Sequence, residues 1–161
     1  MEIQSKIPSE CTEGELNEFH SLVIEGGEVS PIGLPERIKQ ADRLIFVREK
    51  FACIAVGALK RPNDNYKNNV FKKAGVSNLA QDYPFELGWI FSSPAARGKR
   101  VGREIMQSIV KLVGNNGCFA TTRLNNEVMH YLFGQYSFVR VGNEYPSKHG
   151  DYSLILYTYR P

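Results

Sequence analysis

The fold of this chain is decided by residues 85–113, FELGWIFSSPAARGKRVGREIMQSIVKLV. The stretch opens with an apolar run over 85–91, which is typical of a strand, and closes with apolar residues at helical spacing over 101–113. The turn between them carries four cations within seven positions: Arg97, Lys99, Arg100 and Arg103. The first amides of a helix lack acceptors and the helix dipole is positive there, so this arrangement predicts a site for an extended anion.

Two glycines in the turn, Gly98 and Gly102, would let the backbone come close to a diphosphate. A basic, glycine-containing turn alone is more often a solvated face, but the strand before it and the amphipathic helix after it favour a binding site. The turn contains no Gly-Lys-Ser/Thr, and it lacks the GxGxxG spacing of a dinucleotide site. Nucleotide hydrolysis and hydride transfer are therefore disfavoured.

Length and composition indicate a single globular domain over residues 1–161. No apolar run of membrane-spanning length and no signal-peptide pattern is present, so we expect a cytoplasmic protein without a membrane partner. The net charge of +3 is too small for a general polyanion binder, which makes nucleic acid an unlikely ligand. The three cysteines form no CxxC pair, and we expect no metal site.

Hydrophobic periodicity predicts an α/β fold in which a mixed central sheet of six to seven strands is flanked by about four helices. The expected helices span 12–25, where Thr12 and Glu15 form a capping box, and 35–41, 101–113 and 126–135. Val128, Met129 and Leu132 are expected to point inward from the last of these helices, and Trp89 is expected to be a core residue. The expected strands span 2–7, 43–48, 51–59, 85–91, 118–123, 138–141 and 152–159. The polar connection 62–84 is long enough to predict one or two helical turns and a role near the substrate.

The segment Arg97-Gly98-Lys99-Arg100-Val101-Gly102 resembles the signature Gln/Arg-x-x-Gly-x-Gly/Ala of the GCN5-related N-acetyltransferase (GNAT) superfamily. The resemblance extends over most of the chain. It implies a GNAT fold with a V-shaped split between the fourth and fifth strands, where acetyl-CoA binds as co-substrate. Arg100 stands where the family usually has glycine, so we expect a backbone conformation there that is compatible with a Cβ, together with an added phosphate contact.

The resemblance also implies which residues bind the cofactor. Backbone groups of Ile90, Phe91 and Ser92 would pair with pantetheine; Arg97, Gly98, Lys99, Arg100, Val101, Gly102 and Arg103 would hold the pyrophosphate; Asn126 would reach the pantetheine. By residue type and position, Asn126 is an equally good helix N-cap, and the two roles are compatible.

The catalytic base that the resemblance implies is Glu86, eleven positions before Arg97 on the fourth strand. The alternative is a solvated strand carboxylate or one paired with a nearby cation. Relatives commonly carry a tyrosine as general acid, but Phe133 occupies the matching position here and has no proton to donate. Protonation of the departing CoA thiolate by solvent would suffice. Tyr145, in the loop expected before the last strand, is either a strand residue or part of the acceptor pocket.

These observations favour an N-acetyltransferase that moves the acetyl group of acetyl-CoA to a primary amine of a small molecule or peptide, by direct attack with general-base assistance. The missing tyrosine keeps open a second class, a non-catalytic acyl-CoA-binding or sensor domain. A third, RNA binding by the basic turn, is disfavoured by the modest net charge. Exposed edge strands of such domains favour a homodimer.

Overall fold

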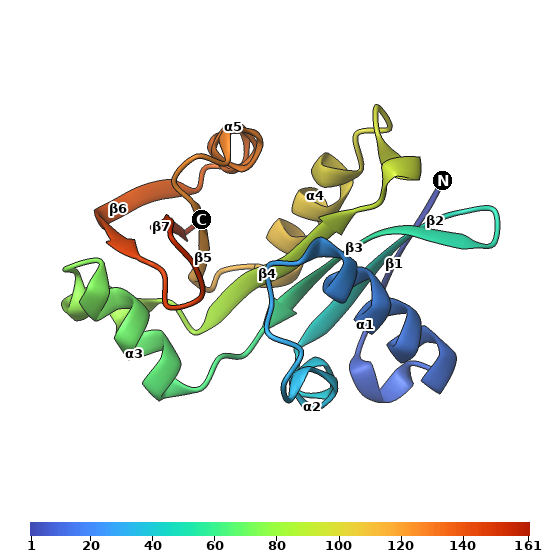
Figure 1. Cartoon of the computed structure of the whole chain (residues 1–161), viewed down its shortest axis with the longest axis horizontal. Coiled ribbons are helices and arrows are strands. Elements are labelled where there is room, and N and C mark those ends of the chain that lie inside the picture. Colours follow the sequence, from blue (N-terminus) through green and yellow to red (C-terminus); the bar gives the residue numbers. More distant parts are fainter. The chain divides into compact units, whose positions relative to one another are not determined.

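The structure, a computed structural model, describes residues 1–161 and contains seven strands and five α-helices (Figure 1). The strands are β1 (Glu2–Lys6), β2 (Arg43–Glu49), β3 (Ala52–Lys60), β4 (Phe85–Ser92), β5 (Cys118–Arg123), β6 (Val139–Pro146) and β7 (Ser153–Tyr159). The helices are α1 (Glu13–Gly26), α2 (Leu34–Lys39), α3 (Asp64–Lys73), α4 (Val101–Val113) and α5 (Glu127–Gln135).

The seven strands form one mixed sheet of order β1-β2-β3-β4-β5-β7-β6. Strands β1, β2 and β3 pair antiparallel, and β7 pairs antiparallel with both β5 and β6. The β4–β5 pair is parallel and has only two registered positions, Phe85 opposite Cys118 and Glu86 opposite Phe119. The predicted fold class, a mixed α/β fold with six to seven strands, is confirmed.

The chain divides into two compact units, which are described separately. The first holds Met1–Lys60 and Leu87–Leu112, and the second holds Arg61–Glu86 and Val113–Pro161. Strand β4 passes from the second unit to the first between Glu86 and Leu87. The single domain expected over 1–161 stays a prediction.

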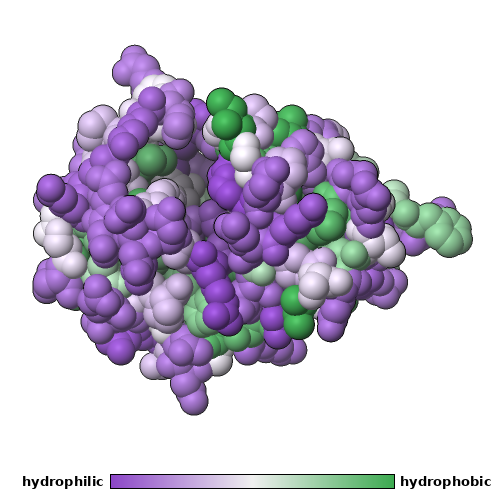
Figure 2. All heavy atoms as spheres, turned by 90° about the horizontal axis from the view of Figure 1, so that it is seen from below, coloured by the Kyte–Doolittle hydropathy of each residue, from purple (hydrophilic) through white to green (hydrophobic).

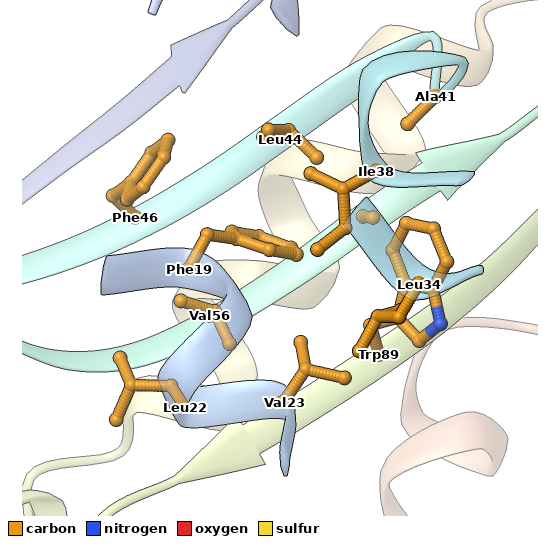
Figure 3. Packing of buried hydrophobic residues seen from close by; sticks show 11 residues of the cluster. Phe19, Leu22, Val23, Leu34, Ile38, Ala41, Leu44, Phe46, Val56 and Trp89 are labelled. Atoms are coloured by element: carbon orange, nitrogen blue, oxygen red, sulfur yellow. The ribbon is translucent and has the colours of Figure 1, made fainter. Parts of the chain in front are cut away.

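In the first unit, α1 and α2 cover one face of the strands (Figures 1 and 3). Figure 3 shows Phe19 and Val23 of α1 directed toward Val56 of β3, and Phe19 meets the Phe46 ring edge-on at 5.5 Å. The predicted capping box starts α1: Thr12 Oγ1 accepts from the Glu15 amide, and the Glu15 carboxylate accepts from the Thr12 amide. This packing removes the apolar stripe of α1 from water.

Helix α4 packs on the opposite face of the same strands (Figure 1). Side chains alternate along a strand, so Val56 points to α1 and Gly57 points to the other side. A Cβ built on Gly57 would lie 2.6 Å from Ile105 Cγ2, and Ile105 is fully buried. The missing side chain at Gly57 is therefore what lets α4 lie so close to β3.

The second unit has its own core, built around Phe71 of α3. The Phe71 ring stacks on Tyr83 at 5.7 Å and meets Phe119 edge-on at 5.2 Å. The prediction of one or two helical turns in 62–84 was too short, because α3 has ten residues and a 3-10 helix follows at Ser77–Asp82. Asn63 caps α3, since its Oδ1 accepts from the Tyr66 amide at 2.8 Å.

Strand β6 is longer than the predicted strand over 138–141. A register shift between Val141 and Tyr145 interrupts its pairing with β7, and Gly142 in the shifted stretch has φ +69°. The Asn143 amide donates to the carbonyl of Ala74, the C-cap of α3, at 2.8 Å. This bulge extends the strand and ties α3 to β6.

Hydrophilic side chains cover most of the face shown in Figure 2, and the hydrophobic atoms there form separate small patches. None of the helices combines the length and the apolar character needed to cross a bilayer. No group of three or more His, Cys, Asp and Glu side chains is arranged to hold a metal ion.

We predict that Gly57→Ala destabilises the protein by about 1–3 kcal/mol, because the added methyl group meets a buried isoleucine that has no room to move. Urea unfolding followed by circular dichroism measures the change. Gly134→Ala in α5 is the control: a Cβ there meets no atom within 4 Å, and alanine favours a helix. Equal stability of the Gly57 variant and the parent would contradict the close approach of α4.

Candidate active site

The predicted anion-binding turn, residues 97–103, lies in the first unit and leads into α4 at Val101. Gly98 and Arg100 both adopt left-handed backbone conformations, with φ +75° and +58°. The conformation at Arg100 is left-handed, a region that a residue with a Cβ enters only at a cost and that glycine enters freely. A non-glycine residue in this region costs about 1–2 kcal/mol.

Not every amide in the turn is available to a ligand. The Arg97 amide donates to the Pro94 carbonyl at 3.2 Å, and the Lys99 amide donates to the Ala96 carbonyl at 3.1 Å. Val101 and Gly102 are the first two residues of α4, where a helix has no carbonyl one turn earlier to receive their N–H groups. The structure thus removes the amides of Arg97 and Lys99 from the predicted set of donors to a ligand.

The four cations of the turn are all exposed. Lys99 forms an ion pair with Glu49, which ends β2, and both side chains are about 40% exposed. The hydrogen bond from Lys99 holds the pKa of the Glu49 carboxyl below its ordinary value. Lys99 is therefore already neutralised in part, so a diphosphate would compete with Glu49 for it.

The predicted pantetheine strand, Ile90 to Ser92, follows an irregularity in β4. Trp89 has φ +52° inside the strand, a conformation that bulky residues rarely adopt. Its side chain is held by an edge contact with Phe19 at 6.1 Å and by Lys60 Nζ, 4.7 Å from the ring centroid. The expectation that Trp89 is a core residue is confirmed. The left-handed residue turns the peptide groups that follow it out of the regular strand alternation.

Glu86, the predicted base, lies in the second unit and is only 3% exposed. Its Oε1 accepts a long hydrogen bond, 3.4 Å, from the hydroxyl of Tyr66 in α3. Burial of the whole residue, with Oε2 shielded from solvent, excludes the alternative of a solvated strand carboxylate. A charged group in such a place is costly unless polar partners or a ligand face it.

Tyr145 belongs to the same unit and lies in β6, not in the loop where the sequence placed it. It packs in the same core as Phe119, which stands opposite Glu86 in the register of β4 and β5. Burial, and after it the negative charge of Glu86, raises the pKa of the Tyr145 phenol well above its ordinary value. Tyr66 was missed by sequence analysis, although the length of the connection 62–84 had indicated a segment near the substrate. The structure brings Tyr66, Glu86 and Tyr145 together.

Asn126 starts α5 and is the N-cap that its residue type predicted, because its Oδ1 accepts from the Met129 amide at 3.2 Å. The cap leaves the Asn126 side-chain N–H groups for other partners. Phe133, on the same helix, is 1% exposed and lies 4.8 Å from the Tyr157 ring and 5.4 Å from the Phe138 ring. The position where relatives commonly carry the acid is thus part of an aromatic core.

The predicted site residues divide between the two units. Ile90, Phe91, Ser92, Arg97, Gly98, Lys99, Arg100, Val101, Gly102 and Arg103 belong to the first unit, and Glu86 and Asn126 belong to the second. The first unit offers helix-start amides and cations, which suit an anion. The second offers a buried carboxylate that accepts a hydrogen bond from a phenol, which suits a cation.

A model of the acetyltransferase (GNAT) family matches residues 35–138, about two thirds of the sequence. The chain belongs to this family. The resemblance to the GNAT superfamily that the sequence indicated is therefore confirmed. Enzymes of this family use acetyl-CoA.

Solved structures similar to this GNAT chain share its fold at low sequence identity. Escherichia coli ElaA has a TM-score of 0.74 with 15% identity, covering 99% of this chain and 100% of that one. An acyl-CoA N-acyltransferase from Pseudomonas aeruginosa has a TM-score of 0.68 with 17% identity, covering 98% and 97%. Salmonella typhimurium YncA, solved with acetyl-CoA, has a TM-score of 0.65 with 11% identity, covering 99% and 93%.

One sequence relative, an uncharacterised protein of Mycobacterium leprae (strain TN), is 30% identical over 87 residues. The aligned part is 51% of this GNAT chain and 24% of that protein, so the match spans about a quarter of the relative's length.

We predict that Arg100→Gly raises the free energy of unfolding by about 0.5–1 kcal/mol, because glycine adopts φ +58° without steric strain. The matched control is Arg103→Gly, which removes the same charge from the first turn of α4. It should lower stability by about 1 kcal/mol. Thermal and urea unfolding of both variants without ligand measure the difference. A destabilised Arg100 variant would show that the turn is not strained.

Proposed function

We propose that this GNAT protein transfers the acetyl group of acetyl-CoA to the nitrogen of a primary amine. The observation that carries the proposal is the turn at 97–103, where two left-handed residues bring exposed cations to the start of α4. This is the chemistry that a diphosphate requires, and it stands within a domain whose family uses acetyl-CoA.

The chain offers hydrogen-bond donors and cations for two parts of the CoA molecule, the pyrophosphate and the pantetheine. The helix-start amides and the cations Arg97, Lys99, Arg100 and Arg103 would bind the pyrophosphate. Peptide groups of Ile90, Phe91 and Ser92, after the irregular Trp89, would pair with pantetheine, and the free N–H groups of Asn126 would reach it from α5. When bound, acetyl-CoA supplies the acetyl group as a thioester.

Glu86 is the group that we assign as base. An ammonium must lose a proton before its nitrogen can attack, and a buried carboxylate receives that proton directly or through one water. The nitrogen then bonds to the thioester carbonyl carbon, gives up its second proton to solvent, and the C–S bond breaks to release the thiolate. Since Phe133 has no proton to donate, the thiolate takes its proton from solvent.

We predict that Glu86→Gln lowers kcat/KM for amine acetylation by about a hundredfold at neutral pH, because glutamine cannot accept the proton. The dissociation constant of acetyl-CoA should stay within about twofold. Release of free CoA thiol, followed across a panel of primary amines, measures turnover, and calorimetry measures binding. The control is Glu144→Gln, an exposed carboxylate of β6.

Two outcomes would contradict this proposal in different ways. Full activity of the Glu86 variant would remove Glu86 as the base. Binding of acetyl-CoA by the parent without turnover of any amine would instead identify an acyl-CoA-binding or sensor domain.

We predict that Glu49→Gln tightens CoA binding about two- to threefold, because Lys99 no longer needs to leave an ion pair to reach the pyrophosphate. The gain should shrink at high salt, where the exposed pair is screened. Calorimetry at two salt concentrations measures it, with Glu36→Gln, on the exposed surface of α2, as control. Weaker CoA binding by the Glu49 variant would show that the ion pair helps to hold the turn in its binding form.

A further inference from the structure

The buried carboxylate of Glu86 and the two tyrosines beside it carry an inference about the acceptor. We propose that Tyr66, Glu86 and Tyr145 form a binding site for a primary alkylammonium group whose neighbouring carbon carries no carboxylate, and that Tyr66 moves aside to admit it. This deepens the proposed function, on which it rests, by naming the chemical class of the acceptor.

The contact between Tyr66 and Glu86 is suited to exchange with a ligand. Hydroxyl–carboxylate hydrogen bonds normally measure 2.5–3.0 Å, and this one measures 3.4 Å. Tyr66 is 43% exposed, whereas Glu86 is 3% exposed, so the phenol links the buried carboxylate to the surface. Rotation of the Tyr66 side chain would uncover Oε1, and an ammonium N–H would bind that oxygen more strongly than a phenol does.

Tyr145 supplies the buried side of this site. It is 5% exposed and packs in the core that also contains Phe71. Phe119, which stands opposite Glu86 in the register of β4 and β5, belongs to the same core and places Tyr145 near the carboxylate. Burial, and after it the charge of Glu86, raises the pKa of the Tyr145 phenol. The Tyr145 phenol therefore stays neutral, and its ring offers a π surface to a cation without adding a positive charge of its own.

The two tyrosines stand on elements that are fixed to each other. Tyr66 lies in the first turn of α3, with its amide bonded to Asn63 Oδ1. The other end of α3 is tied to β6, the strand of Tyr145, by the hydrogen bond from the Asn143 amide to the Ala74 carbonyl. A Cβ on Gly142 would lie 2.2 Å from that carbonyl oxygen, so only glycine permits the approach. Only the Tyr66 side chain needs to move.

The chemistry of the three side chains selects the ligand. A carboxylate between aromatic rings attracts an ammonium by charge and by cation–π contact. The same carboxylate repels an acceptor whose amine is next to a carboxylate, as in a free α-amino acid. Side-chain amines, simple alkylamines and the amino ends of peptides meet the requirement.

The test uses n-pentylammonium and norleucine, which differ only by the carboxylate on the carbon next to nitrogen, with 1-pentanol as uncharged comparison. In a titration followed by 1H–15N NMR, n-pentylammonium should shift the amide signals of Tyr66, Glu86 and Tyr145, and the other two compounds should not. The Glu86→Gln variant should lose these shifts while the rest of its spectrum stays dispersed. This measurement needs no turnover.

Kinetics of acetylation provide the second measurement. Tyr66→Ala should raise KM for n-pentylamine about tenfold and change kcat less than about twofold, since the ring contributes to ammonium binding. Tyr66→Phe keeps the ring but loses the hydroxyl that competes with the ammonium for Oε1, so its KM should fall below the parental value. Tyr131→Ala, which removes an exposed tyrosine from α5, is the control.

The outcomes separate this inference from the proposed function. Ammonium-specific shifts without any acetylation would support the site and overturn the transferase proposal. Acetylation without those shifts, or with norleucine accepted as readily as n-pentylamine, would overturn the site and leave the transferase proposal standing. Neither shifts nor acetylation would overturn both.

Discussion

The strained turn before α4 is the feature on which the proposed binding of the cofactor depends. Helix-start amides serve an anion only if the preceding backbone leaves room for it, and the left-handed residues Gly98 and Arg100 shape the backbone just before the helix. The strain at Arg100 must be offset by the packing of the helix that follows. That packing depends in turn on Gly57, whose missing side chain leaves room for Ile105. A residue with no contact to any ligand thereby helps to hold the turn.

A second constraint operates in the other unit, where a carboxylate is removed from water. Burial of the Glu86 carboxylate costs free energy, and the hydrogen bond from the Tyr66 hydroxyl offsets part of that cost. The bulge of β6 at Gly142 fixes the backbone of α3 against the strand that carries Tyr145. Residues 61–86 are therefore a structured part of the proposed site and not a loose connection.

The sequence predicted the parts of the fold that local rules control. The Thr12 capping box, the Asn126 cap and the burial of Trp89 were all readable from residue type and spacing. The errors arose where tertiary contacts override local preference. Helix α3 is polar enough to resemble a loop, and only its packing through Phe71 stabilises it. Val128 was expected to point inward with Met129 and Leu132, yet it is 75% exposed, because a nine-residue helix packed by Leu132 and Phe133 leaves that face outside.

The aromatic core at α5 explains how Asn126 is held where no tyrosine acid is present. His130 Nε2 lies 2.7 Å from the Leu124 carbonyl, which can only accept, so this nitrogen donates. His130 Nδ1 forms the second hydrogen bond, with the Tyr157 hydroxyl at 2.6 Å. The chain from Tyr157 through His130 to Leu124 thus locks the residues just before Asn126 to strand β7, while Phe133 packs against the same tyrosine. Helix α5 therefore has no tyrosine at the position of Phe133, but its first residues are rigidly held. This rigidity suits the role that we propose for Asn126, a side-chain donor to pantetheine.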